Sequence, residues 1–528
     1  MKASARHRKK ASCASLRRKA KRIDNRRKRK KALKHLPARC AKPKPPKAPV
    51  QTTIPAGTQP AATQVAPPTT GTPTPAAPAP APPGPVTSPI ALYSGTFGPR
   101  QAERLLWRAG FGPRPEQAAQ LAALGLQEAV VSLTRPSGAA VMEGPEPSVD
   151  DAPLDPYNEW GHDHLWWLDR MVRSQQSLVE RMALVWHDWF STSDAGVGSR
   201  EFMLEQNNLF RNGGLGNFKD LVRAITQDKA MQVWLSALDN KKKAINENYG
   251  RELMELFTLG ADRGAYTETD VRELARSLSG FTATWDSDEG LVDFRFSTTR
   301  WDSGQKTVFG NTGAFNWEDA ARMVVEHAMH PSFFVTKLWG YFIADPIPDA
   351  TRDALAAAYA DSGYEIRPIV EAILCAPQLY TGGAMVKPPV VMTAGLLRAT
   401  GQGIVDSQWV WMDSNAGQQL FYPPDVSGWD DARWLDTNTM AGRWELVNGV
   451  LGDTNVQPSN TYKAETAAEA IAAARASLND PPLTAETESA ITGWANDLLP
   501  AKTTGYQRAQ RYNALRQLIA MSPDHQTS

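Results

Sequence analysis

The stretch KKKAINENYGRELMELFTLGADRGAYTETDVRELARSLSG, residues 241–280, contains two helical patterns separated by glycine-containing sequence. In the first pattern, Leu253 and Phe257 recur at a spacing that places both on one face of an α-helix. The second pattern follows Thr267 and has Asp270 three residues on, an arrangement typical of a capping box in which aspartate replaces the usual glutamate. Two helices joined by a short loop therefore predict a helical body around this stretch.

Helical spacing continues along most of the chain and is interrupted once. Residues 281–310 alternate in polarity and are rich in turn formers, with Val292, Phe294 and Phe296 at period two, which predicts a short hairpin or small sheet. The predicted fold is mainly α, a large multi-helix domain with this small β insertion. The other stretches with helical patterns are 99–134, 162–192, 217–238, 316–343, 351–377, 388–400, 464–478 and 506–523.

The N-terminal segment has a different composition from the rest of the chain. Of 58 basic and 56 acidic residues, positions 1–47 hold 21 and one, so the segment carries a net charge of +20 and the remainder −18. Residues 48–99 lack charge and are dominated by proline, alanine and threonine, which predicts a polyproline-like linker. We expect a disordered basic tail (1–47), a linker (48–99) and a helical domain (100–523).

The tail predicts binding to a polyanion, because neutralising phosphates or other anions with lysine and arginine releases counterions. Nucleic acid, anionic lipid and an anionic wall polymer all fit, and a purely solvated tail is the structural alternative. The chain contains no transmembrane-length apolar segment, and no signal peptide is visible behind the charged N-terminus. The cysteines, Cys13, Cys40 and Cys375, are too far apart to indicate a disulfide framework or a zinc site.

The polar cluster that begins in the opening stretch is a candidate site. Glu252 and Glu255 are three residues apart, so both carboxylates project from one helix face. With His187 and Asp302 they make a predicted divalent-metal set, since histidine nitrogen and carboxylate oxygen are common metal ligands. Such a metal would activate water for hydrolysis, with Glu252, Glu255, Arg251 and Asn248 as catalytic residues.

The same cluster also has a purely structural interpretation. Asn246 and Glu247 stand where a helix cap and a first-turn acid belong. Arg251 and Glu255 are four residues apart, the spacing of a surface ion pair. Glu252 and Glu255 lie opposite the apolar stripe and would then face water.

A tryptophan-rich segment, residues 418–444, is predicted to be a loop and a second candidate site. Tryptophan faces next to carboxylates are a common way to hold sugar rings, and packing of the loop over the core is the alternative. The candidate ligand-binding residues are Trp429, Trp434, Asp425 and Asp430.

Several stretches, taken together and in their order along the chain, are specific enough to carry a resemblance: RLLWRAGFGPRP, ERMALVWHDWFSTS, GLGNFKDLVRAITQDKAM, NENYGRELMELFTLG, YTETDVRELARSLSGF, GQKTVFG, KLWGYFI, PPDVSGW and LRQLIAMSP. Over roughly residues 100–523, the chain resembles a bacterial family known as domain of unknown function 1800. The family's proteins are largely helical and commonly exported, and are often encoded beside a partner family related to the alkaline-phosphatase superfamily. The resemblance therefore implies such a partner and brings no established reaction.

The chain departs from the family pattern at two places. The pair Trp301-Asp302 stands where the family usually has His-Asp before the G-x-K-T run. Many relatives continue with His-x-x-Phe after the first histidine of the W-H motif, whereas this chain continues after His187 with Asp188, Trp189 and Phe190.

The sequence supports two hypotheses for the function. One is a metal-assisted, hydrolase-like domain acting on a polymer; the other is a non-catalytic scaffold that binds a glycan or a partner and is tethered by its basic arm. The tryptophan at position 301 favours the second.

Overall fold

The opening stretch forms two helices, and the first changes its hydrogen-bonding pattern along its length. Helix α12 (Asn248–Glu252) runs directly into a π-helix, η3 (Leu253–Thr258). The N-cap residue of α12 is Glu247, one position later than the expected Asn246, and the Asn246 side chain accepts a hydrogen bond from the Asn248 backbone N–H at 3.0 Å. The sequence spacing predicts a regular α-helix throughout. The structure differs at its end, where the Thr258 hydroxyl donates to the Leu253 carbonyl five residues earlier.

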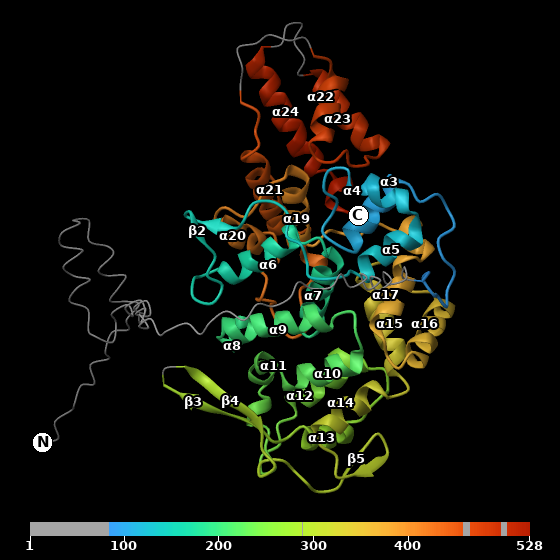
Figure 1. Ribbon diagram of the computed structural model, residues 1–528, viewed down its shortest axis with the longest axis vertical. Helices are drawn as coiled ribbons and strands as arrows, with labels where there is room; N and C mark the ends of the chain where they lie inside the picture. Colours follow the sequence, from blue (N-terminus) through green and yellow to red (C-terminus); the bar gives the residue numbers. More distant parts are fainter. Residues whose placement is uncertain (1–83, 288, 458–464, 498–503) are drawn as a thin grey trace, which may run out of the picture. The chain divides into compact units, whose positions relative to one another are not determined.

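The computed structural model describes residues 84–287, 289–457, 465–497 and 504–528, which all belong to one compact unit (Figure 1). Its first helices are α3 (Pro99–Arg108), α4 (Gln117–Leu124), α5 (Leu126–Thr134), α6 (His162–Arg173), α7 (Ser177–Trp189), α8 (Asp194–Val197) and α9 (Arg200–Gly213). The middle part adds α10 (Phe218–Gln227), α11 (Lys229–Trp234), η2 (Ala237–Asp239), α13 (Glu268–Ser277) and α14 (Trp317–Val325). The later helices are α15 (His330–Gly340), α16 (Asp349–Asp361), α17 (Ile366–Leu374), α18 (Pro377–Thr381), α19 (Pro389–Thr400), α20 (Gln408–Asn415), η4 (Asp431–Arg433), α21 (Thr437–Gly452), α22 (Ala467–Ala476), α23 (Ala485–Asp497), α24 (Gly505–Ala520) and α25 (Pro523–Gln526).

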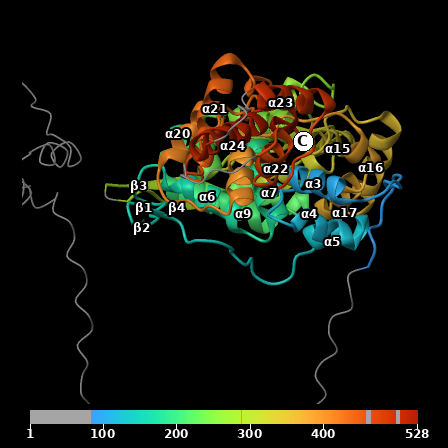
Figure 2. The same ribbon diagram turned by 90° about the horizontal axis from the view of Figure 1, so that it is seen from above.

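The mainly α fold with a small β insertion is therefore confirmed. The predicted hairpin is formed by β3 (Phe281–Asp286) and β4 (Gly290–Phe296), which pair antiparallel. Two shorter antiparallel pairs accompany it, β1–β2 (Ser148–Val149 with Ala152–Pro153) and β5–β6 (Lys306–Val308 with Asn311–Gly313). The β1–β2 and β3–β4 pairs lie toward the same edge of the helical body (Figures 1 and 2).

Helix α13 has the predicted capping box. The Thr267 hydroxyl accepts from the Asp270 backbone N–H, and the Asp270 carboxylate accepts from the Thr267 backbone N–H. Val271 and Leu274 are fully buried, as the spacing predicts.

Side chains from other helices satisfy the last carbonyl groups of η3. Lys337 Nζ donates to the Leu256 carbonyl at 3.0 Å, and Trp189 Nε1 donates to the Phe257 carbonyl at 3.0 Å. His330 Nδ1 lies 2.8 Å from the next carbonyl. Because helix ends leave carbonyls without intrahelical partners, these three donors fix α7 and α15 to the end of η3.

The core around this junction is aromatic. Trp186 and Trp189 on α7 pack with Phe218 of α10 and Phe334 of α15, at ring-centroid distances of 4.8 to 6.4 Å. All four side chains are buried. Burial of rings this large dominates the local packing energy, so α7 is held rigidly at the centre of the unit.

The packed body extends beyond the predicted domain limits at both ends. Val86 is buried and the Tyr93 backbone N–H donates to the Cys375 carbonyl at 2.8 Å, so packing begins before residue 100. At the other end, the backbone N–H groups of Met385 and Ser528 each donate to the other residue's carbonyl at 2.9 Å. The predicted basic tail and most of the predicted linker lie outside the described residues. No helix in the described part of the chain is long and apolar enough to cross a membrane.

Replacing Trp189 with phenylalanine should destabilise the fold, because it leaves the buried Phe257 carbonyl without its donor. We expect the free energy of unfolding to fall by about 1–3 kcal/mol in urea titrations. Trp411, which is 44% exposed, provides the matched control. Trp411→Phe should change the free energy of unfolding by less than about 0.5 kcal/mol. Equal effects of the two substitutions would contradict this role for Trp189.

Candidate functional site

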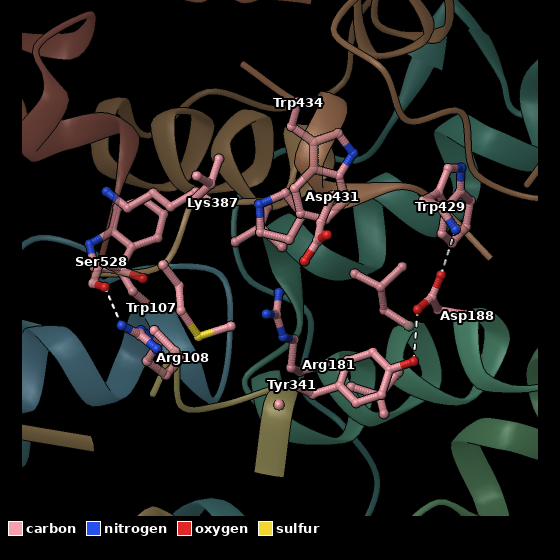
Figure 3. A pocket seen from close by; sticks show the side chains of 18 of the residues that line it. Trp107, Arg108, Arg181, Asp188, Tyr341, Lys387, Trp429, Asp431, Trp434 and Ser528 are labelled. Carbon is pink, nitrogen blue, oxygen red and sulfur yellow. Dashed lines mark hydrogen bonds between the residues drawn. The ribbon is translucent and has the colours of Figure 1, made fainter. Parts of the chain in front are cut away.

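A cleft of about 590 Å³ lies where α3, α7, α15 and the segment containing η4 meet (Figure 3). Its wall combines charged and aromatic side chains from stretches far apart in the sequence. Those used below are Trp107, Arg108, Arg181, Asp188, Lys337, Tyr341, Lys387, Trp429, Asp431 and Trp434.

Two helices supply the polar groups of the cleft at helical spacing. On α7, Arg181 and Asp188 are seven residues apart and so occupy one face, with Leu184 and Val185 between them. At the end of α15, Lys337 and Tyr341 are four residues apart. Residues at these intervals lie on one face of a helix, and each of the two helices presents that face to the cleft.

Asp188 connects α7, α15 and the tryptophan-rich segment. Its Oδ1 accepts from the Trp429 backbone N–H at 2.9 Å, and its Oδ2 accepts from the Tyr341 hydroxyl at 2.7 Å (Figure 3). Burial raises the pKa of Asp188, while these two hydrogen bonds and nearby Lys337 act in the opposite direction. The carboxylate therefore has a full set of partners and acts as an anchor for the segment.

The approach of this segment to Asp188 requires a glycine at position 428. Gly428 has φ of +97°, and a Cβ added there would overlap the Asp188 carboxylate. Ser191 adds a second link, since its hydroxyl donates to the Asp425 carbonyl at 2.6 Å. The C-terminal end of α7 thus determines where Trp429 lies.

Arg181 carries the least compensated charge in the cleft. Its side chain is buried, yet Nε and Nη1 have no hydrogen-bond partner, and no ion pair to it occurs among the described residues. Burial lowers the pKa of Arg181 to about 10, so it is still charged at neutral pH. The indole Nε1 atoms of Trp429 and Trp434 are also buried without partners in the described structure. Buried polar groups are normally satisfied, so acceptors from water or from a ligand would complete these donors.

The other cations of the cleft are held by backbone carbonyls and aromatic rings. Lys337 lies 4.5 Å from the centre of the Trp189 ring, and Lys387 lies 3.7 Å from that of Trp107. Burial lowers the pKa of Lys337 to about 8 and that of Lys387 to about 7. Arg108 donates to the Phe342 carbonyl at 2.7 Å. Within the described residues, none of these cations forms an ion pair with an aspartate or glutamate side chain.

The predicted metal ligands lie in separate environments. His187 is fully buried among the rings of Trp167, Phe210, Phe421 and Trp429, and neither ring nitrogen has a hydrogen-bond partner in the described structure. Burial lowers its pKa to about 3, which keeps the imidazole neutral. His187 thus supports the ring of Trp429 from behind.

Asp302 takes part in a different contact network. Its Oδ2 accepts from Arg276 Nε at 2.7 Å, and this guanidinium keeps the pKa of Asp302 below its usual value. Glu252 is half-buried, and burial with the neighbouring charge of Glu255 raises its pKa. No group of three or more His, Cys, Asp or Glu side chains suited to a metal occurs among the described residues. The predicted set of His187, Glu252, Glu255 and Asp302 is therefore not brought together.

Two of the predicted catalytic residues, Arg251 and Asn248, form contacts within the fold. Arg251 pairs with Glu268 at 2.7 Å and with Glu247 at 3.4 Å. Asn248 Nδ2 donates to the Leu235 carbonyl at 3.3 Å. The first pairing joins α12 to α13, so the partner of Arg251 is Glu268 and not the expected Glu255.

The tryptophan-rich segment is divided between irregular backbone and helix. Helix α21 begins at Thr437, so the last part of the predicted loop, including Trp444, is helical. Trp429 and Trp434 line the cleft, whereas Asp425 and Asp430 accept hydrogen bonds from backbone N–H groups two residues on and stabilise turns. The carboxylate that lines the cleft is Asp431.

Residues 104–527 match the sequence profile of the family described as "Protein of unknown function (DUF1800)". The chain belongs to this family. No curated protein and no solved structure matches the sequence or the fold of this chain. Four of the stretches that carry the DUF1800 resemblance supply cleft residues: RLLWRAGFGPRP, ERMALVWHDWFSTS, KLWGYFI and PPDVSGW.

Of the cleft residues, sequence reasoning named Trp429 and Trp434 and missed the others, Arg181, Asp188 and Tyr341 among them. The signal present in this DUF1800 chain is a pair of charged residues seven positions apart, on one face of a helix with many apolar positions, as in ERMALVWHD. His187 was predicted to be a metal ligand, whereas the residue that lines the cleft is the adjacent Asp188.

Gly428→Ala should displace the tryptophan-rich segment, because it combines a strained φ with overlap on Asp188. We expect a loss of more than about 2 kcal/mol in the free energy of unfolding and faster proteolysis of residues 421–436. The matched control is Gly198→Ala, where φ is +69° but no heavy atom lies within 4 Å of the added Cβ. Similar losses at both glycines would show that the Asp188 contact is unimportant.

The buried amine of Lys337 should make stability depend on pH. Its pKa is about 8 in the folded chain against 10.5 normally, so unfolding takes up a proton between these values and the free energy of unfolding rises with pH there. Lys337→Met removes this contribution. Urea titrations from pH 7 to 10 should show the free energy of unfolding of wild type rising relative to that of the variant. A difference between the two proteins that does not change with pH would contradict the lowered pKa of Lys337.

Proposed function

We propose that the cleft binds an acidic sugar and that the protein is a non-catalytic glycan-binding member of its family. The observation that supports this is Arg181, a buried guanidinium with no compensating partner among the described residues. The same cleft is lined by Trp429 and Trp434, whose indole N–H groups also lack a hydrogen-bond acceptor in the described structure. A sugar carboxylate would pair with the guanidinium, and ring oxygens and hydroxyls would accept from the indoles.

The aromatic part of the wall favours a sugar over a simple inorganic anion. Trp107, Trp429 and Trp434 all line the cleft and offer apolar surface for a pyranose ring. Asp431, exposed at its side chain, would accept hydrogen bonds from sugar hydroxyls. The metal-assisted hydrolase is less well supported, since its predicted ligands lie in separate contact networks.

A purely structural role for Arg181 would require a partner that repays its desolvation. Arg211 on α9 shows that situation: it donates to the buried carboxylate of Glu180 at 2.8 Å. Arg181 lacks any such bond in the described residues, so its charge costs stability in the free protein. Retaining an unpaired buried cation is expected where function uses it.

Arg181→Met should therefore weaken binding of the acidic sugar without destabilising the fold. Nuclear magnetic resonance titration of the full chain with galacturonic acid should give at least about tenfold weaker affinity for the variant, the value of one charge-assisted contact. Its free energy of unfolding should be unchanged or higher by roughly 1–2 kcal/mol, because an unpaired buried charge is removed.

Two controls make the result specific. Arg211→Met should lower stability by about 3 kcal/mol and leave galacturonic acid binding unchanged, because it leaves Glu180 with one cation fewer. Galactose, which lacks the carboxylate, should bind wild type and Arg181→Met alike. Equal binding of galacturonic acid by wild type and Arg181→Met would reject the proposed function.

A further inference from the structure

We infer that the ligand is an acidic polysaccharide chain that continues from the cleft along α3 into a second cavity, an inference that rests on the proposed function. The second cavity has a volume of about 320 Å³. Trp107, Lys387 and Ser528 line both cavities, so the two adjoin on either side of these residues. A single sugar fills one cavity, whereas an extended chain would occupy both.

Helix α3 carries a row of cations from one cavity to the other. Arg100, Arg104 and Arg108 are spaced by four residues, which places them along one helix face at intervals of roughly 6 Å. Arg100 and Arg104 line the second cavity, and Arg108 lines the first. A regular series of positive charges fits a ligand whose negative charges also repeat.

Arg100 is the member of this row that is free to bind. It is exposed and forms no hydrogen bond or ion pair with the described residues, whereas Arg104 donates to the carbonyls of Gly382 and Gly383 at 2.7 Å. Arg108 is likewise bound to backbone carbonyls. Arg100 can therefore be replaced without removing a contact that holds the fold.

The walls of both cavities favour a polysaccharide over a nucleic acid. Asp431 lines the first cavity, and Glu103 and Asp524 line the second, so both cavities contain carboxylates as well as arginines. Carboxylates would repel a continuous phosphate backbone but accept hydrogen bonds from the hydroxyls of a sugar chain. Burial raises the pKa of Glu103 to about 7. Near neutral pH this carboxyl can therefore either accept a hydrogen bond from a sugar hydroxyl or donate one to it.

The test measures affinity against chain length for wild type and Arg100→Ala, using galacturonic acid, its trimer and its hexamer. For wild type, affinity should rise from monomer to hexamer. Arg100→Ala should leave monomer affinity unchanged and weaken hexamer binding roughly three- to fivefold, the value of one exposed charge contact. The basic N-terminal tail is present in both proteins, so its attraction for a polyanion cancels in this comparison.

The outcomes separate this inference from the proposed function. Hexamer binding that is unaffected by Arg100→Ala, with monomer binding still dependent on Arg181, overturns the extended chain and leaves the acidic-sugar site intact. Monomer binding that does not depend on Arg181 rejects the proposed function itself. A polydeoxythymidine strand of matched charge should bind equally to both proteins through the tail alone; a loss with Arg100→Ala as large as that for the hexamer would overturn the choice of a polysaccharide.

Discussion

The two hydrogen bonds that Asp188 accepts determine how the cleft is built. One joins α7 to the backbone of Trp429 and the other joins α7 to Tyr341 at the end of α15. Because Asp188 is half-buried, both bonds are partly shielded from water, where they hold geometry more strongly than at the surface. The neutral ring of His187 supports Trp429 on the adjacent side. One short segment of α7 thus positions Trp429 within the aromatic wall of the cleft.

Arg181 differs from other buried arginines of the molecule. Arg398 and Arg443 are also buried without an acidic partner in the described residues, but both donate hydrogen bonds to backbone carbonyls. Arg181 has no such acceptor among the described residues, and Lys337 rests on a carbonyl and an aromatic ring. Leaving a buried cation without an acceptor lowers stability, and under the proposed function the carboxylate of the sugar supplies that acceptor.

The sequence predicted most of the local structure and little of the site. Helical spacing and the Thr267–Asp270 capping box located α13, and period-two alternation located the β3–β4 hairpin, because both signals are local. The metal set rests on a signal that is not local. Whether His187 and Asp302 meet depends on helix packing, and each side chain found partners nearer to it: aromatic rings for His187 and Arg276 for Asp302. Trp429 and Trp434 were found because aromatic residues in an irregular segment are themselves a local signal.

The end of η3 is linked to the wall of the cleft through its backbone. A π-helix closes its hydrogen bonds over five residues instead of four, as between the Leu259 N–H and the Met254 carbonyl at 2.8 Å. Within this π-helical turn, the carbonyl of Leu256 accepts a hydrogen bond from the amine of Lys337, which lines the cleft. A helix that contributes no side chain to the cleft lining therefore helps to hold one of the cations of the cleft in place.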